Sequence, residues 1–264
     1  MNLFERDYTK IITSEDKEAL LLEKEWDMTG GFDGTRNIDN WPTLSHPNIE
    51  CRKFLERHQS IYPNNYLGLF CHETFDMLKE AKEYESIIYN NGDEKTIQAY
   101  IKTNRKWFIP ASIFIGYGML PGYYLFPEMK LGAEYIVDYM LLAPHSADYH
   151  IIFVEFENAN TKFLLDSSNS ESESVRKGIA QLRDWKQWIE DNRDYFHQST
   201  GLKDRNISIP LTNIFYCLVV SRRDKMSKRA RDVRSRLCYE MSNTKIITFD
   251  RLADNIRYFS LNNL

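Results

Sequence analysis

The sequence predicts an α/β (α+β) protein in which a mixed sheet flanked by helices follows a mainly helical N-terminal region. Residues 132–141 alternate between apolar and polar side chains. After a short polar turn, residues 151–159 begin with an apolar run and continue to two carboxylates, so the two segments indicate two strands. Residues 211–221 and 244–250 are β-branched and aromatic runs typical of buried strands. Apolar residues recur at three- and four-residue spacing in residues 49–89 and 174–189, which indicates helices.

The composition describes a folded protein. Of the 264 residues, 42% are hydrophobic and 14% are aromatic, enough for a substantial core. The net charge of −4 means that the molecule as a whole does not attract nucleic acid, so any such binding needs a local basic patch. The N-terminus has no apolar signal region and no run is long enough to span a membrane. We therefore expect a soluble, cytoplasmic protein without a membrane partner.

The four cysteines are widely spaced, at positions 51, 71, 217 and 238. None belongs to a CxxC pair, and none has a zinc-site spacing to the six histidines. Because their neighbours are mostly apolar, the simplest interpretation is a set of buried free thiols in a reducing compartment.

Residues 1–90 are expected to form a helical region, and residues 91–264 a second domain. The residues of the first region reveal no role; the family resemblance described below implies that it is regulatory. A helix over residues 14–27 has Ser14 as its expected N-cap and acidic residues in its first turn. Residues 28–49 are rich in turn formers and predict an irregular connection anchored by a few apolar side chains.

The second domain opens with a helix that Asp93 or a neighbour caps and that extends to about residue 109. Glu94 lies in its first turn, where the helix dipole favours a carboxylate. Residues 110–124 combine glycines and prolines with aromatic residues. We expect a strand or a bend there, packed beneath the site described next.

Three acidic residues lie where the predicted strands leave the core. Every second residue of a strand faces the same side, so Glu155 and Glu157 share one face. If the two strands form an antiparallel hairpin, Asp138 lies beside Glu155. Crowded carboxylates are unstable unless a cation neutralises them, and oxygen ligands suit Mg²⁺ or Mn²⁺. The pattern predicts a metal site for phosphodiester hydrolysis; the alternative is a solvated strand face with three ordinary surface acids.

The helix over residues 174–189 follows a polar, serine-rich loop at residues 166–174. Gln181 and Trp185 are four residues apart and therefore share one face, whereas an apolar stripe on another face packs on the sheet. The loop is expected next to the predicted metal site. There it is either a gate for substrate or a plain solvated connection.

An aspartate, then Glu-x-Glu, then a helix carrying Gln-xxx-aromatic resembles the PD-(D/E)xK nuclease superfamily and, within it, the Shedu antiphage-defence nuclease domain. The resemblance extends from about Asp93 to the C-terminus and is carried by the segments EYIVDYML, IFVEFENANTKFLL, GIAQLRDWKQWIEDN and IITFDRL. It implies a restriction-endonuclease-like fold and a Mg²⁺- or Mn²⁺-dependent endonuclease that cleaves DNA, with RNA as a second candidate substrate. It also implies a homo-oligomer.

The resemblance assigns roles to individual residues. Asp138, Glu155 and Glu94 are the implied metal ligands, and Asp138, Glu155, Glu157 and Gln181 are the implied catalytic residues. The superfamily usually carries lysine at the last motif position, where this chain has Glu157. A carboxylate there acts as a general base or as an extra metal ligand, or it marks an altered site. The alternative function is therefore a nucleic-acid-binding or sensing protein that keeps the nuclease fold.

Residues 222–236 form a basic segment in an otherwise acidic chain. Eight Lys or Arg residues stand against two Asp residues, a local charge of +6. Contacts from Lys and Arg to phosphate provide most of the non-specific affinity for nucleic acid. The predicted nucleic-acid-binding residues are Arg222, Arg223, Lys225, Lys228 and Arg229. The alternative is a solvated amphipathic helix whose apolar residues face inward.

Overall fold

A computed structural model describes residues 6–29, 47–68, 76–119, 123–145 and 148–261. The chain forms two compact units, which divide between residues 74 and 75. The boundary predicted at residue 90 coincides with the end of helix α4 (Met77–Asn90). That helix packs against α11 (Phe249–Leu261), so it belongs to the second unit.

Within the described residues of the first unit, helices α1 (Ser14–Thr29) and α3 (Ile49–His58) share a small core. The buried residues of that core are Ala19, Cys51, Phe54 and Leu55. The irregular connection predicted between the helices lies largely outside the described residues.

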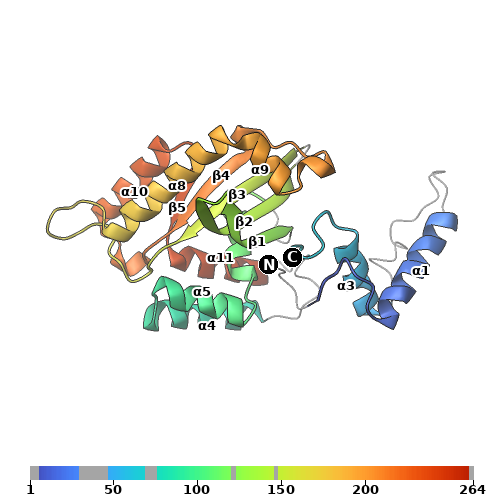
Figure 1. The fold of residues 1–264 in the computed structure, drawn as a ribbon. Helices are drawn as coiled ribbons and strands as arrows, with labels where there is room; N and C mark the ends of the chain where they lie inside the picture. Colours follow the sequence, from blue (N-terminus) through green and yellow to red (C-terminus); the bar gives the residue numbers. More distant parts are fainter. Residues whose placement is uncertain (1–5, 30–46, 69–75, 120–122, 146–147, 262–264) are drawn as a thin grey trace. The chain divides into compact units, whose positions relative to one another are not determined.

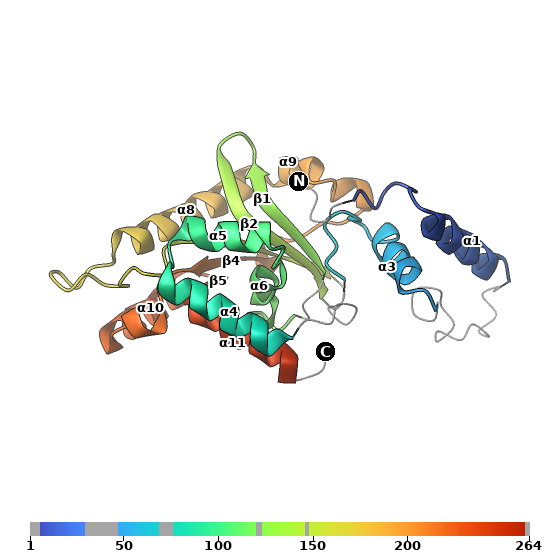
Figure 2. The same cartoon turned by 90° about the horizontal axis from the view of Figure 1, so that it is seen from below.

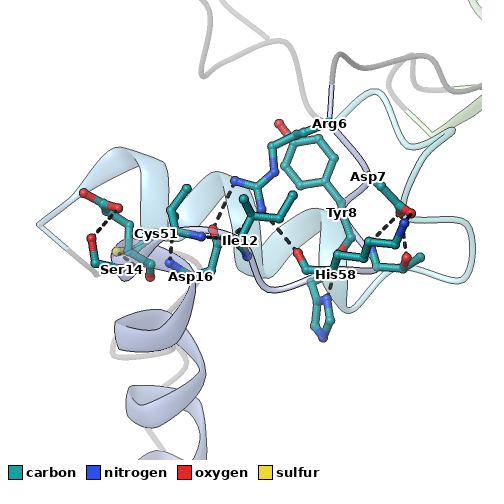
Figure 3. Close-up of polar contacts among 12 residues, drawn as sticks. Arg6, Asp7, Tyr8, Ile12, Ser14, Asp16, Cys51 and His58 are labelled. Carbon is teal, nitrogen blue, oxygen red and sulfur yellow. Dashed lines mark hydrogen bonds and ion pairs between the residues drawn. The ribbon is translucent and has the colours of Figure 1, made fainter.

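Asp16 organises the chain before α1, as Figure 3 shows. Its carboxylate is 1% exposed and accepts hydrogen bonds from the backbone N–H groups of Ile12 and Thr13 and from the guanidinium of Arg6, at 2.7 to 3.1 Å. Thr13 Oγ1 in turn accepts a hydrogen bond from the Asp16 N–H. The N-cap is therefore Thr13, and the prediction of Ser14 was wrong, because Thr13 and Asp16 satisfy each other in a reciprocal cap.

The second unit is built on a five-stranded mixed sheet in the order β1-β2-β3-β4-β5. Its first three strands are antiparallel neighbours, and β3, β4 and β5 are parallel neighbours. The strands are β1 (Tyr124–Leu131), β2 (Tyr135–His145), β3 (Asp148–Phe156), β4 (Ile214–Val219) and β5 (Thr244–Ile247). This sheet confirms the predicted α+β class and the antiparallel hairpin.

Helices cover both faces of the sheet (Figures 1 and 2). One face carries α8 (Glu173–Asp191), α9 (Arg193–Ser199) and α10 (Lys228–Glu240). The other carries α4, α5 (Glu94–Thr103) and α11, with the short helices α6 (Phe108–Ala111) and α7 (Ile113–Gly116) against α11. Three 3₁₀ turns complete the described unit: η3 (Lys203–Arg205), η4 (Leu211–Asn213) and η5 (Arg223–Lys225).

Alternate residues of β3 contact the two helix layers. Phe153 packs edge-on against Phe196 of α9, with ring centroids 5.8 Å apart. Phe156 packs in the same way against Phe249 of α11, at 5.3 Å. A strand buried on both faces therefore leads directly to the carboxylates at its end.

The segment between α5 and β1 differs from its prediction. A strand or a bend was expected over residues 110–124, but most of residues 108–116 is helical, in α6 and α7. Pro110 lies within the first turn of α6, where its missing N–H breaks no helical hydrogen bond. The apolar side chains from Phe108 to Phe114 are almost all buried, and two tight helical turns place them on several sides at once.

Two other predictions concern solubility and redox state. Cys51, Cys217 and Cys238 are free thiols, and the first two are buried, as expected; Cys71 lies outside the described residues. Among the helices that the structure describes, none combines the length and apolar character needed to cross a membrane.

Candidate functional site

The site lies where β2 and β3 separate. Their register extends to the pair Tyr139 and Val154. Beyond that pair, the backbone N–H of Phe156 donates to Oδ2 of Asp138 at 2.7 Å. A regular antiparallel ladder would give that N–H to a β2 carbonyl oxygen. The half-buried Asp138 carboxylate therefore occupies the gap between the diverging strands, beside the residue that follows Glu155.

Glu155 and Glu157 continue from the buried strand. Their side chains are 4% and 3% exposed, so the alternative of a solvated strand face is wrong for both. The backbone N–H of Glu157 donates to the carbonyl oxygen of Val219 at 2.9 Å, which extends the pairing with β4 by one residue. Burial of both carboxylates is therefore a property of the sheet and not of a mobile loop.

Helix α5 brings Glu94 and Gln98 to the same place. Asp93 is the N-cap, as predicted, because its Oδ1 accepts a hydrogen bond from the Thr96 N–H at 3.0 Å. Glu94 and Gln98 are one helical turn apart and share a face. Gln98 hydrogen-bonds the Asp138 carboxylate and accepts a hydrogen bond from the Tyr139 hydroxyl at 2.7 Å. Sequence reasoning missed Gln98, although its spacing from Glu94 was a usable signal.

The charges of the four carboxylates are coupled. Burial raises the pKa of Asp138, and the charges of Glu94 and Glu157 add to that rise, whereas hydrogen bonds from the Phe156 N–H and Gln98 oppose it. Burial also raises the pKa of Glu155, with further increases from Asp138 and Glu157. The pKa of Glu157 is raised by burial against the opposing effect of a nearby lysine. Protons or a bound cation must therefore compensate this cluster.

The donor set fits a hard divalent cation by its chemistry. Carboxylate oxygens are the ligands that Mg²⁺ and Mn²⁺ prefer, and buried acids with raised pKa values gain most from a positive charge nearby. Within the described residues, however, no three acidic, histidine or cysteine side chains converge closely enough to hold an ion. Asp138, Glu155 and Glu94 are thus within electrostatic range of one another without forming a closed chelating group.

Helix α8 reaches the site because of a glycine. A Cβ on Gly178 would lie 2.4 Å from Leu218 Cδ1 and 3.3 Å from Glu157 Cγ, so only glycine permits this approach of helix and sheet. Trp185, two turns further along, is fully buried. Gln181 has a buried Oε1 that accepts no hydrogen bond from the described residues.

A lysine that sequence reasoning missed lies on the same helix. Lys177 Nζ is 2.9 Å from Glu157 Oε1, and its pKa is raised first by this contact and then by the charges of Glu157, Glu94 and Glu155, against the opposing effect of burial. Lys177 precedes Gln181 by four residues, so both lie on one face of α8. That four-residue spacing could have identified Lys177 as a candidate site residue from the sequence.

A cavity of about 280 Å³ opens beside Asp138 on the side of α5. It is lined by residues of α5, of the segment that follows it, and of strands β1 and β2. Those lining residues are Glu94, Lys95, Gln98, Ala99, Lys102, Trp107, Pro127, Glu128, Asp138 and Tyr139. Two of the four clustered carboxylates, Glu94 and Asp138, therefore border a space large enough for part of a substrate.

Arg222 does not have the surroundings of a phosphate contact. Its side chain is buried, its Nη1 donates to the Ile88 carbonyl oxygen at 2.7 Å, and its guanidinium lies 4.4 Å from the centroid of the Tyr89 ring. It also pairs with Asp224. The prediction for Arg222 is corrected accordingly: the guanidinium connects the end of α4 to the turn after β4.

The other basic candidates are more accessible. Arg223 is exposed, and its guanidinium pairs with Asp254. Lys228 and Arg229 are exposed in the first turn of α10, whose N-cap is Ser227, and Lys225 is half-buried in η5. The inward face of α10 includes the buried Ala230 and Leu237, so the helix is amphipathic as the alternative interpretation expected. Accessible charge and an apolar inner face coexist on this helix.

The polar loop before α8 is held by backbone hydrogen bonds and by a β-bridge. Leu165 N–H donates to the Ser170 carbonyl oxygen at 2.8 Å, and Leu164 forms a bridge with Glu171. The loop borders a surface groove of about 500 Å³ along α10, lined by Asn169, Glu171, Arg229, Asp232, Val233 and Arg236. The loop therefore borders a groove on α10, and its role as a gate or as a plain connection stays a prediction.

The chain matches one family model, and no curated protein matches it. The model is described as "Shedu protein SduA, C-terminal" and matches residues 91–253, more than half of the chain. The matched range contains the four coupled carboxylates, Lys177 and the whole of the sheet. The chain therefore belongs to the Shedu family, and this membership implies a role in antiphage defence.

Proposed function

We propose that this protein is a metal-dependent endonuclease that cleaves DNA in the cytoplasm as part of antiphage defence. The observation that carries the proposal is the pair of carboxylates where β2 and β3 separate, Asp138 on β2 and Glu155 on β3. Each raises the electrostatic cost of ionising a buried neighbour, and both have raised pKa values. A carboxylate pair of this kind is the usual protein contribution to a divalent-cation site for phosphoryl chemistry. The order of motifs around the pair supports the same reaction.

The residues have distinct roles in this proposal. Asp138 and Glu155 would hold one Mg²⁺ or Mn²⁺, with Glu94 as a further ligand from the first turn of α5. Such an ion would supply Lewis-acid stabilisation of the charge that develops at the phosphate. Glu157 accepts a proton from the attacking water, for which its raised pKa is favourable. Gln181 accepts a hydrogen bond from a water molecule at its unpartnered amide oxygen, or its amide NH2 group donates to the phosphate backbone.

DNA is the proposed substrate, with RNA as the second possibility. Exposed basic side chains at the start of α10, Lys228 and Arg229, are the proposed contacts to the phosphate backbone outside the site. We also propose that the protein acts as a homo-oligomer, as expected for this family.

The direct test is incubation of the purified protein with linear, nicked and supercoiled DNA and with RNA, in Mg²⁺, Mn²⁺ or EDTA. Asp138→Asn and Glu155→Gln remove one charge each with little change of shape. The matched control is Glu134→Gln, which changes an exposed carboxylate in the turn before β2. We expect metal-dependent cutting that both site variants lose and the control keeps. Full activity in either site variant would remove the assignment.

A second candidate function is recognition of nucleic acid without cleavage. It is favoured by the residue Glu157 at the position where lysine is usual, and by the open arrangement of the carboxylates. Metal binding separates the two candidates. A working site predicts that Mn²⁺ raises the melting temperature of the wild type and that Glu155→Ala abolishes this increase. DNA binding without any metal-dependent stabilisation or cutting would support recognition alone.

A further inference from the structure

Lys177 has an unusual position among the charges of the site. Its ammonium is 2.9 Å from Glu157 Oε1 and is electrostatically coupled to Glu94 and Glu155. The Lys177 side chain is 56% exposed, whereas that of Glu157 is 4% exposed. One side of the ammonium is therefore held by a buried carboxylate, and the other side faces solvent, from which a substrate arrives.

The fold holds this ammonium in place. The close contact of Gly178 with Leu218 fixes the distance between α8 and the sheet. Gln181 follows one turn later on the same face, with its Oε1 buried and accepting no hydrogen bond from the described residues. Helix α8 thus holds the Lys177 ammonium against Glu157, the residue that follows β3, with Gln181 one turn along the same face of the helix.

The negative charge of the site indicates why a cation such as the Lys177 ammonium is needed there. Four carboxylates repel a phosphodiester, and a single divalent ion neutralises only part of that charge. A phosphate approaching the metal ligands therefore needs another positive group. Lys177 supplies such a group at the rim of the cluster, in a geometry that leaves ammonium hydrogens available for an acceptor other than Glu157.

We infer that Lys177 is a substrate-binding catalytic residue: its ammonium, anchored by Glu157, donates a hydrogen bond to a non-bridging oxygen of the scissile phosphodiester. The inference rests on the proposed nuclease function and adds the group that receives the substrate. The contact strengthens as negative charge develops on the phosphate oxygens, so it contributes to the rate as well as to binding. No proton is transferred by Lys177 in this role.

Binding of a short DNA duplex in EDTA tests the contact without cleavage. Lys177→Met removes the charge at similar length, and Lys177→Arg keeps it. The matched control is Lys186→Met, the same change on the same helix at a lysine bonded to Ser242. We expect Lys177→Met to weaken binding and to reduce the slope of log K against log salt by about 0.9, the value for one phosphate contact. Lys177→Arg and the control should keep the wild-type slope.

A double variant separates contact from simple neutralisation. If Lys177 only compensates Glu157, then Lys177→Met combined with Glu157→Gln restores the local charge and should restore DNA binding. If Lys177 touches phosphate, the double variant stays as weak as Lys177→Met, with the same reduced salt slope. Restored binding would overturn the inference.

Cleavage assays complete the test. We expect Lys177→Met to cut DNA on the order of 10²-fold more slowly than the wild type, with Lys177→Arg partly active. A wild type that cuts, together with a Lys177→Met variant that cuts and binds equally well, would overturn the inference and leave the nuclease function intact. A wild type that neither cuts nor binds would overturn both. If the wild type binds DNA without cutting it, the salt dependence of binding tests the inference. A reduced slope for Lys177→Met supports the phosphate contact, and an unchanged slope contradicts it.

Discussion

The backbone N–H of Phe156 donates a hydrogen bond to Asp138 Oδ2 at 2.7 Å, so a side-chain carboxylate holds the place of a strand carbonyl at the point where β2 and β3 part. The same carboxylate is both a structural acceptor and a proposed metal ligand. The two roles can be separated by choosing substitutions that keep or remove the acceptor.

Asp138→Asn and Asp138→Ala should therefore differ in stability although both lose cleavage. Asparagine keeps an oxygen for the Phe156 N–H, whereas alanine leaves a buried donor unpaired, which costs about 1–3 kcal/mol. Urea unfolding in EDTA measures the difference. Equal unfolding free energies for the two variants would show that this hydrogen bond does not hold the strands at their divergence.

Gly178→Ala should destabilise the protein by about 1–3 kcal/mol, because the new methyl group would overlap Leu218 Cδ1. The displaced helix should also bind DNA more weakly, since Lys177 and Gln181 move with it. Gly116→Ala is the control, because a Cβ at Gly116 meets no described atom within 4 Å. Thermal unfolding is measured for Gly178→Ala and Gly116→Ala. A double variant, Gly178→Ala with Leu218→Ala, removes the overlapping side chain and so tests whether steric overlap causes the loss of stability. A double variant no more stable than Gly178→Ala alone would argue against the steric explanation.

Arg222 and Arg229 should respond in opposite ways to alanine substitution. Arg222→Ala removes a buried donor from the Ile88 carbonyl oxygen and the contact with the Tyr89 ring, so we expect a loss of about 1–3 kcal/mol in unfolding free energy. Arg229→Ala should leave unfolding unchanged and lower the salt slope of DNA binding by about one contact. Unfolding and DNA titrations of the two variants are compared directly. Equal salt slopes for Arg229→Ala and the wild type would exclude Arg229 from the phosphate contacts.

Asp16 should make the stability of the chain depend on acidic pH. Burial alone would raise the pKa of Asp16, but hydrogen bonds from Arg6 and from the N–H groups of Thr13 and Ile12 outweigh it and lower the pKa to about 2. A lowered folded-state pKa gives stability that is present above the unfolded value and lost as the pH falls through the folded value. The wild type should exceed Asp16→Asn by on the order of 2 kcal/mol above about pH 4 and lose this margin toward about pH 2. A margin that does not change over that range would show that the Asp16 charge is not responsible.

The hairpin and the carboxylates on it were predictable, because strand alternation is a local property of the sequence. Glu155 and Glu157 are two residues apart and had to share a face, and Asp138 followed once the strands were paired. Helix α8 was equally predictable from its apolar stripe. The prediction failed at residues 108–116, where apolar side chains buried on all sides leave no periodicity to distinguish helix from strand.

The sequence by itself determined the β2–β3 hairpin, the strands β4 and β5, helix α8 and the acidic residues on the hairpin, because these depend on spacing along the chain. Only the tertiary structure decided that Lys177 contacts those acids and that Arg222 does not. Lys177 and Arg222 have long, flexible side chains, and both come from segments next to the site. Lys177 finds the buried carboxylate of Glu157, whereas Arg222 finds the carbonyl oxygen of Ile88. Glu157 and Ile88 are distant in the sequence from the side chains that contact them, so packing of the sheet and helices assigns these two contacts.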